Sequence, residues 1–231
     1  MTPVVRKVFI AVVALVVAVV GVPWVYINVV KDDAPDALTL EPTPTTLDVA
    51  TTIAEATDPL LDGVWSVQSD SVVGYRVKEI LFGQSTEGVG RTNAVTGSLA
   101  IAAEQVTEAR FEVDMTTLVS DSDRRDRQVR GRILDTASYP TATFELGAPI
   151  SLTPDALAGG DLVVDAKGSL TLRGVTKDVT VALVARVTDG VIEVNGSLEI
   201  VFADWSIPDP SISAIAVEDR GLLEFLLRFG R

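Results

Sequence analysis

The chain of 231 residues contains neither cysteine nor histidine. Without cysteine it cannot form disulfides, zinc–thiolate sites, iron–sulfur clusters or a thiolate nucleophile. Without histidine it cannot carry a Ser-His-Asp triad or an imidazole-bound metal, and it lacks the side chain best suited to proton transfer near neutral pH. Only carboxylate, lysine, tyrosine or Ser-Lys chemistry remains, so we expect no enzyme activity, no catalytic residues and no metal site.

Basic residues are also scarce, since 19 Lys and Arg stand against 32 Asp and Glu, for a net charge of -13. The charge is uneven: residues 1–31 carry +3, residues 32–61 carry -7, and residues 62–231 carry -9. An acidic body repels the phosphate backbone, so nucleic acid is not an expected partner. The charge map predicts three regions with these boundaries: an N-terminal anchor, a linker and one folded domain.

The N-terminal region has a long uncharged run, "VFIAVVALVVAVVGVPWVYI", over residues 8–27. A helix of this length is about 30 Å long, which matches the hydrocarbon core of a bilayer. Arg6 and Lys7 precede it, and basic flanks stay in the cytoplasm. The pattern favours a single-pass anchor with a cytoplasmic N-terminus; a cleaved signal peptide is the alternative. Both place the rest of the chain outside the cytoplasm.

Residues 32–61 contain four prolines among threonine, alanine and acidic residues. Such a composition is low in aromatic residues and self-repelling, which is typical of a disordered, extended tether. We therefore predict a disordered linker between the membrane segment and the folded domain.

From Trp65 onward, apolar and polar residues alternate in segment after segment, as in Ala109, Phe111, Val113 and Met115. This period indicates strands that are buried on one face. About eight such segments, separated by Gly, Asp and Pro turns, predict an all-β, antiparallel barrel or sandwich. The C-terminal "GLLEFLLRF" fits either a closing strand or a helical turn with an apolar stripe.

A barrel of about eight strands is either filled by its own side chains or holds one small elongated ligand. The alternation turns mostly aliphatic and aromatic residues inward and implies no buried acid or base, so a hollow interior would take an apolar ligand. A filled barrel, serving as an interaction module, is the alternative. The predicted cavity residues are Tyr75, Val77, Phe111, Val113, Phe144, Leu170, Leu172, Val181, Leu183, Leu198 and Phe202.

Residues 120–134, "SDSDRRDRQVRGRIL", concentrate five arginines in an acidic chain. Acidic residues at the start, basic residues at the end and a narrow apolar stripe predict a short helix. Its charges admit three interpretations: exposed pairs four residues apart, bidentate bonds from Arg125 and Asp126 that hold the helix on the barrel rim, or binding of a phosphate or quinone headgroup at a tunnel mouth. The candidate headgroup residues are Arg124, Arg125 and Arg130.

Together, these segments resemble the YceI-like family of lipocalin-like proteins that are associated with polyisoprenoid binding. The phrases that carry the resemblance are "WSV" at Trp65, "GYRVKE" at residues 74–79, "VTGSLAI" at 95–101, "ARFEVDMTTLVSDSDRRD" ending at Asp126, "YPTATFEL" at 139–146, "GSLTLRGVTKDV" at 168–179 and "DWSI" at 204–207. The resemblance implies a lipocalin-like barrel whose tunnel holds an isoprenoid chain, and it does not imply catalysis.

The sequence therefore predicts a membrane-anchored member of this family that binds, sequesters or carries a long-chain isoprenoid lipid outside the cytoplasm. A polyisoprenoid or an isoprenoid quinone would be its bound group. Two rivals remain at this point. One is the ligand-free interaction module, and the other is a lipid-modifying enzyme that uses carboxylates such as Asp114 or Asp126. The oligomeric state is not predicted.

Overall fold

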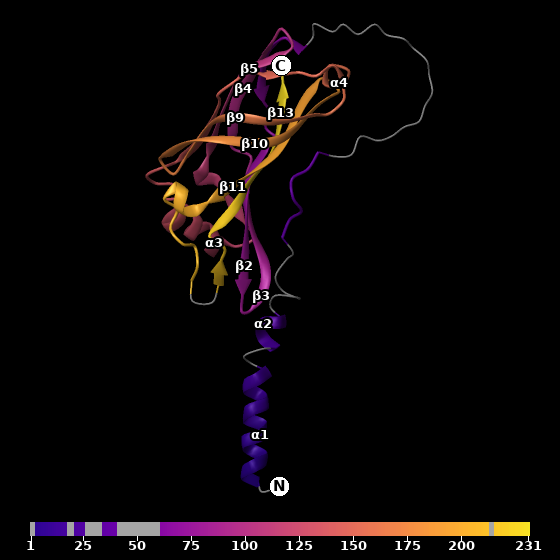
Figure 1. Cartoon of the computed structure of the whole chain (residues 1–231). Helices are drawn as coiled ribbons and strands as arrows, with labels where there is room; N and C mark the ends of the chain where they lie inside the picture. The colour runs from indigo at the N-terminus through magenta and orange to yellow at the C-terminus, as the bar shows by residue number, and fades with distance from the viewer. Residues whose placement is uncertain (1–2, 18–20, 26–33, 41–60, 213–214) are drawn as a thin grey trace, which may run out of the picture.

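The computed structural model describes residues 3–17, 21–25, 34–40, 61–212 and 215–231 (Figure 1). The first two ranges hold helices α1 (Pro3–Val16) and α2 (Val22–Val25), which extend beyond one end of the barrel. Within these ranges, no helix is both long enough and apolar enough to cross a bilayer. The predicted span of residues 8–27 includes residues 18–20 and 26–27, which lie outside the described residues. The membrane anchor therefore stays a prediction.

Eight strands form a closed ring in which each strand runs antiparallel to both neighbours. In order around the ring they are β1 (Gly63–Val67), β4 (Val95–Ala102), β5 (Gln105–Asp114), β7 (Thr141–Leu146), β9 (Leu162–Leu172), β10 (Val175–Thr188), β11 (Val191–Val201) and β13 (Arg220–Gly230). The alternating residues thus form an antiparallel eight-stranded barrel, as the sequence predicts. The C-terminal segment is a strand, not a helical turn, because β11 satisfies its backbone groups along its whole length.

On the side away from β11, strand β13 pairs with two strands in turn, β1 and β2 (Val72–Leu81), and this lengthens the barrel. Near its end, Phe229 pairs with Val67 of β1 and closes the ring. Near its start, Leu222 pairs with Arg76 of β2, which continues the wall into β3 (Gln84–Thr92). The shorter elements are η4 (Met115–Thr117), β6 (Val119–Ser120), α3 (Asp123–Gln128), η5 (Val129–Ile133), β8 (Ile150–Ser151), α4 (Pro154–Leu157), η6 (Phe202–Trp205) and β12 (Ile215–Val217).

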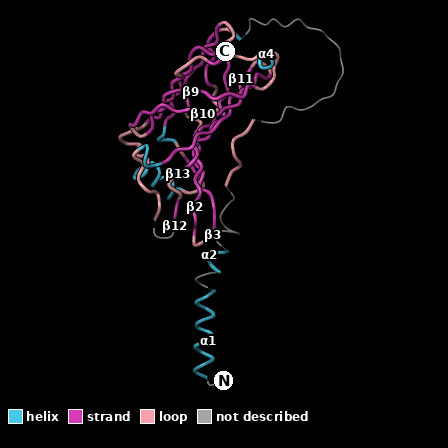
Figure 2. The backbone as a smooth tube through the Cα atoms, in the orientation of Figure 1, coloured by secondary structure: helices cyan, strands magenta, loops and turns pink. Residues whose placement is uncertain are grey.

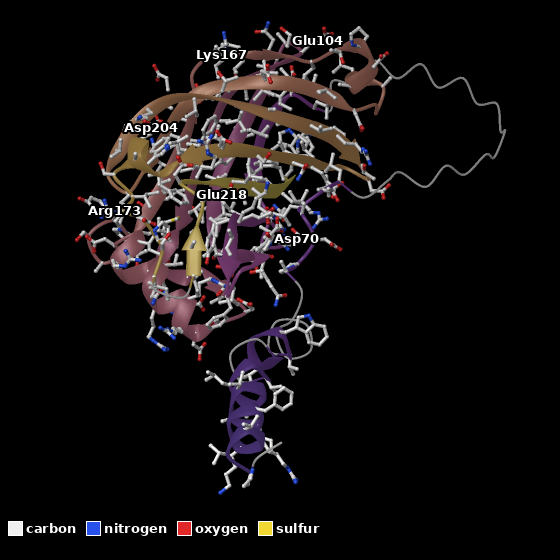
Figure 3. All side chains as sticks on the ribbon, turned by 60° about the horizontal axis from the view of Figure 1, so that its bottom comes forward. Asp70, Glu104, Lys167, Arg173, Asp204 and Glu218 are labelled. Carbon is white, nitrogen blue, oxygen red and sulfur yellow. The ribbon has the colours of Figure 1, made fainter. Side chains whose placement is uncertain are left out.

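Strands make up nearly all of the barrel, with α3 and α4 toward opposite ends (Figure 2). Charged side chains such as Glu104, Lys167 and Asp204 lie on the outer surface (Figure 3). Two clusters of buried apolar residues line the inner side of the wall. The first contains Trp65, Val95, Leu99, Ile101, Val113, Ile192, Leu227 and Phe229, and the second contains Ala142, Leu170, Leu172, Ile200, Phe202, Trp205 and Ile207. Period-two patterning therefore places the apolar residues on the inner face.

Part of the predicted linker lies against the outside of the barrel. We call residues 34–40 the strap. Its backbone carbonyls accept three hydrogen bonds from barrel side chains: Arg76 Nη2 to Pro35 O at 2.6 Å, Arg91 Nη2 to Asp36 O, and Asn195 Nδ2 to Leu38 O at 2.8 Å. The predicted linker of residues 32–61 is thus held along one stretch. Its residues 41–60 lie outside the described ranges.

Candidate functional site

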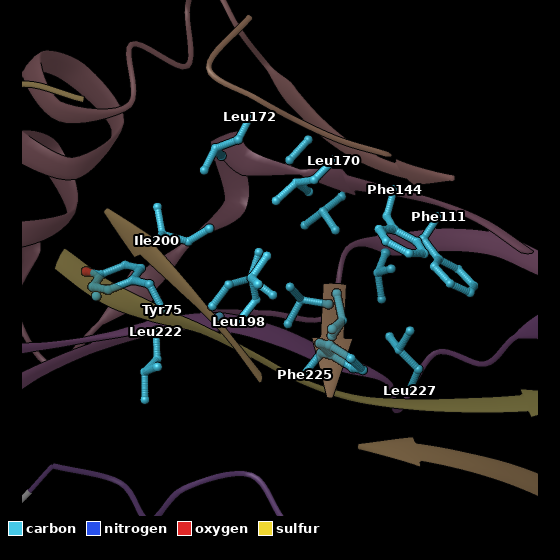
Figure 4. A pocket seen from close by; sticks show the side chains of 18 of the residues that line it. Tyr75, Phe111, Phe144, Leu170, Leu172, Leu198, Ile200, Leu222, Phe225 and Leu227 are labelled. Atoms are coloured by element: carbon cyan, nitrogen blue, oxygen red, sulfur yellow. The ribbon is translucent and has the colours of Figure 1, made fainter. Parts of the chain in front are cut away.

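The barrel encloses a cavity of about 910 Å³ that runs along its interior (Figure 4). Its walls are mainly leucine, isoleucine, valine and phenylalanine side chains from β2, β4, β5, β7, β9, β10, β11 and β13. All eleven residues that the alternation predicts as cavity residues line it. Their contact with a ligand stays a prediction. A volume in this range is typical of sites for small molecules and cofactors.

Four aromatic rings of the cavity wall each lie over a glycine. Cβ atoms built onto the glycines would lie 2.3 Å from the Tyr75 ring at Gly90, 2.9 Å from Phe111 at Gly97, 2.4 Å from Phe144 at Gly168 and 2.6 Å from Phe225 at Gly196. Three of these pairs are direct cross-strand partners. Each ring therefore rests on the backbone of the barrel wall instead of projecting across the lumen, and this keeps the interior hollow.

This arrangement predicts a strong effect at Gly90, where the three atoms nearest a new Cβ all belong to Tyr75. In Gly90→Ala, the ring must leave the wall and enter the lumen, which costs about 1–3 kcal/mol of unfolding free energy, as overpacking does. The control is Gly131→Ala, since nothing lies within 4 Å of a Cβ at Gly131. Urea unfolding should show a loss for Gly90→Ala alone. Equal stability of the two variants would contradict the proposed role of the glycines.

The exposed residues of the cavity lining gather at the end that holds the β2–β3 turn. They include Val22 of α2, Phe82 of the turn, Asp121 just before α3 and Arg124 within α3. We call this end of the barrel the mouth. At the ring's opposite end, the fully buried Phe229 packs within the first apolar cluster.

A buried acid lies just inside the mouth. Glu79 is only 5% exposed, and its Oε1 accepts from Arg125 Nη2 at 2.9 Å and from Thr86 Oγ1 at 3.1 Å. Arg125 also pairs with Asp121, four residues before it. The guanidinium group lies beside Gly88, where a Cβ would be 3.2 Å from its Nε. The ion pair therefore joins α3 to the β2–β3 hairpin.

Glu79 corrects the expectation that no acid faces inward. The alternation of β2 runs through Tyr75 and Val77 to Glu79 and Leu81, all of which line the cavity. The signal was thus present in the period-two pattern, because one further step from Val77 reaches Glu79. An acid tolerates this position because Arg125 pairs with it; an unpaired buried carboxylate would be costly.

The three predicted headgroup residues have different surroundings. Arg124 and Arg125 line the cavity, whereas Arg130 does not. Arg130 instead donates from Nη1 to the carbonyl of Leu118 at 3.1 Å and to that of Thr116 at 3.4 Å. Arg130 thus lies outside the cavity lining, because its donors hold the loop after η4, and its contact with a headgroup stays a prediction. Within the described part of the chain, Arg124 makes no hydrogen bond or ion pair.

The two carboxylates considered for catalysis, Asp114 and Asp126, both accept hydrogen bonds from nearby backbone N–H groups. Asp114 Oδ1 accepts from the backbone N and the Oγ1 of Thr116, at 2.9 and 2.6 Å. Asp126 is buried, and its Oδ1 accepts from the backbone N and the Oγ of Ser120, at 2.9 and 2.6 Å. Asp126 thus fastens α3 to β6, which gives this residue a structural role.

Tyr75 brings a phenol to the lumen (Figure 4), where the charges of Arg125 and Glu79 act on it. Burial raises the pKa of Tyr75 above its ordinary value, although the charge of Arg125 acts in the opposite direction. A tyrosine whose folded-state pKa is raised makes the folded protein lose stability as pH rises above about 10, the value in the unfolded chain.

We expect a late-titrating tyrosine signal in the ultraviolet absorbance of the folded protein, and we expect Tyr75→Phe to remove it. Between pH 9 and pH 11, the free energy of unfolding of Tyr75→Phe should fall by about 1 kcal/mol less than that of the unmodified chain. A titration curve that is unchanged in the variant would show that Tyr75 is not the raised group.

The closed antiparallel ring and its apolar lumen define a hollow β-barrel of lipocalin-like architecture, in which apolar surface lines an enclosed space. Comparison with known families agrees with this class, because the model of the YceI-like domain matches residues 65–229. The chain belongs to the YceI-like family.

Individual relatives are similar over part of their length. The chain is 35% identical over 96 residues to a UPF0312 protein of Shewanella sp. strain ANA-3 and 36% identical to one of Shewanella baltica strain OS155. The aligned stretch covers 40% of this chain and 47% of each relative, so the chain spans about half the length of the curated relatives it matches.

Two solved structures share the fold. A polyisoprenoid-binding domain from Saccharophagus degradans, implicated in plant cell wall breakdown, has a TM-score of 0.57 and 20% identity, over 72% of this chain and 97% of that domain. Burkholderia cenocepacia BcnA has a TM-score of 0.52 and 20% identity, over 68% of this chain and 95% of that chain. At this identity, the likeness concerns the architecture alone.

Proposed function

We propose that this protein binds a long-chain isoprenoid lipid in the barrel cavity and sequesters or carries it outside the cytoplasm. The observation that carries the proposal is the apolar lumen of about 910 Å³, which the aromatic–glycine pairs keep hollow. Burying a methylene group contributes about 0.8 kcal/mol. An isoprenoid chain enclosed along the lumen gains this term repeatedly, and this gain opposes the cost of ordering the chain.

The mouth favours a polar headgroup without a large net charge. Its charged lining residues are Glu79, Asp121, Arg124 and Arg125, whose formal charges cancel. Since two acids already pair with Arg125, Arg124 is the arginine best placed to meet a headgroup. This balance favours a neutral headgroup, such as a quinone, over a phosphate.

Binding without catalysis is part of this proposal. The absence of histidine and cysteine from the sequence supports it, and so do the structural hydrogen bonds of Asp114 and Asp126. The similar fold of the polyisoprenoid-binding domain from Saccharophagus degradans supports the choice of ligand class. The apolar N-terminal run supports attachment to a membrane, which is the source of such lipids.

Native mass spectrometry of the full chain, purified from its own membranes and followed by lipid extraction, tests the proposal. We expect co-purifying species whose masses differ by isoprene units. Repeated recovery of protein without bound lipid would contradict it and would favour the ligand-free interaction module.

A further inference from the structure

The turn at the mouth carries a bulky residue in an unusual conformation. Phe82 and Gly83 are the two central residues of the β2–β3 turn, between the paired Leu81 and Gln84, and their φ angles are +50° and +83°. Two-residue turns with positive φ at both positions favour Asn-Gly, because a bulky side chain is strained there. Backbone strain of this kind is a reason to look for a function.

The side chain of Phe82 is also exposed. Its exposed fraction is 55%, and that of the neighbouring Ile80 is 51%. Phe82 belongs to the cavity lining together with Val22 of α2, and Figure 1 shows the β2–β3 hairpin pointing toward α2. The strained aromatic residue thus stands where the apolar N-terminal segment meets the opening of the lumen. Aromatic and aliphatic side chains in such a place suit the interface of a bilayer.

The strap limits how far the barrel can move from α2. Eight residues separate Val25 from residue 34, and an extended chain spans at most about 3.5 Å per residue, so the strap begins within roughly 30 Å of α2. With the strap released, the chain from Val25 to residue 61 would allow roughly 120 Å by the same measure. The three hydrogen bonds to its carbonyls therefore convert a long tether into a short one.

The strap is also held by an apolar contact. Ala37 and Leu38 lie in a groove of the outer wall beside Val163, Ala182 and Val184. The two arginines that donate to the strap both bind Glu224, whose exposed fraction is 4%. These partners are built into the barrel wall, so the docking site is rigid.

We propose that the mouth of the barrel is a membrane-contacting surface: Phe82 and Ile80 insert into the bilayer interface, and the docked strap keeps the mouth there, so that lipid enters the cavity directly from the membrane. This inference rests on the proposed lipid-binding function and on the predicted anchor. It assigns a partner, the lipid surface, to one end of the fold.

Because the chain contains no cysteine, one introduced cysteine can be labelled uniquely. We would attach a polarity-sensitive fluorophore to Phe82→Cys in the full chain, reconstituted into phosphatidylcholine vesicles that contain nitroxide-labelled lipid. We expect at least about two-fold quenching and a blue-shifted emission. The matched control is Val64→Cys on β1, outside the strap groove, whose exposed fraction is 64%, and it should not be quenched. Equal quenching at both sites, or none at either, would overturn the proposal.

The strap is tested in the same assay with a charge placed in its groove. Leu38→Asp should release the strap and reduce the quenching of the label at position 82 at least two-fold. Thr39→Asp, at the exposed neighbouring position, should leave the quenching unchanged. If Leu38→Asp has no effect, the strap does not hold the mouth at the membrane.

Transfer of lipid gives a readout that separates this inference from the proposed function. Phe82→Asn suits the turn, so it should fold with an equal or higher melting temperature. We expect it to take up a fluorescent polyprenol from vesicles about five-fold more slowly. Ile80→Ser, at an exposed position outside the cavity lining, should also slow the uptake while its affinity for the same polyprenol in detergent stays unchanged. Unchanged uptake would overturn the membrane-contacting surface alone, whereas loss of binding by the unmodified chain in detergent would overturn the lipid-binding function.

Discussion

The Leu198→Trp variant is expected to bind a polyprenol at least about 100-fold more weakly than the unmodified chain while remaining folded. Leu198 lies on β11 and faces the lumen between Tyr75 and Phe225 (Figure 4). Its side chain is only partly buried because it borders the cavity. The larger indole therefore extends into the hollow interior and not into packed core.

The size of this effect follows from the apolar transfer term. Excluding one isoprene unit removes five carbon groups from the lumen, which is about 4 kcal/mol at 0.8 kcal/mol per methylene. A tenfold change in affinity corresponds to about 1.4 kcal/mol, so even partial exclusion reaches the expected factor. Titration with a fluorescent polyprenol in detergent measures it.

The control for Leu198→Trp is Val64→Trp, which adds the same side chain to an exposed position on the outer wall, away from the strap groove. This variant should bind the polyprenol like the unmodified chain. If both variants retain full affinity, the lumen is not the binding site. If Leu198→Trp unfolds at a lower temperature than Val64→Trp, a second substitution, Leu183→Trp, which also fills the cavity, separates loss of space from loss of stability.

The Glu224→Gln variant is expected to lose about 2–3 kcal/mol of unfolding free energy. Glu224 is a buried carboxylate on the outer face of β13, paired with Arg76 at 3.2 Å and with Arg91 at 2.8 Å. Burial lowers the pKa of Arg76, but its hydrogen bonds to Glu87 and Glu224 raise it further, so the pKa lies above its ordinary value. Removing the carboxylate charge leaves two guanidinium groups side by side with too few anions.

For a chain of this length, about 2–3 kcal/mol corresponds to a melting temperature about 5–10 °C lower. Differential scanning calorimetry measures the shift. The control is Glu199→Gln, which removes the carboxylate of an exposed pair with Arg220. Exposed pairs contribute little, so its melting temperature should be unchanged. A similar shift in melting temperature for both variants would mean that the buried ion pairs of Glu224 contribute no more to stability than the exposed pair of Glu199.

The Glu224→Gln variant also bears on the strap. Arg76 and Arg91 donate both to Glu224 and to carbonyls of the strap. If Glu224→Gln misplaces these guanidinium groups, it loosens the strap together with the wall. Leu38→Asp acts on the strap without touching the ion-pair network, so a comparison of their melting temperatures shows how much of the stability comes from the strap itself.

Much of the barrel could be predicted from the sequence because period-two alternation decides which side chains face inward, whatever the strand order. All eleven predicted cavity residues line the lumen for this reason. The same rule, extended by one step along β2, would also have found Glu79. The bond from Arg130 to the carbonyl of Leu118 could not be predicted, because helical spacing alone does not tell which carbonyls a long side chain will reach.

The sequence by itself determined the class of fold, the apolar character of the interior and the absence of histidine and cysteine chemistry. Only the tertiary structure decided that the interior is hollow. Whether an aromatic ring lies over a glycine depends on the register between strands, and for Phe225 and Gly196 those strands are paired across 29 residues of sequence. The docking of the strap was likewise invisible in the sequence, because its partners are side chains of β2, β3 and β11 that become neighbours only when the barrel closes.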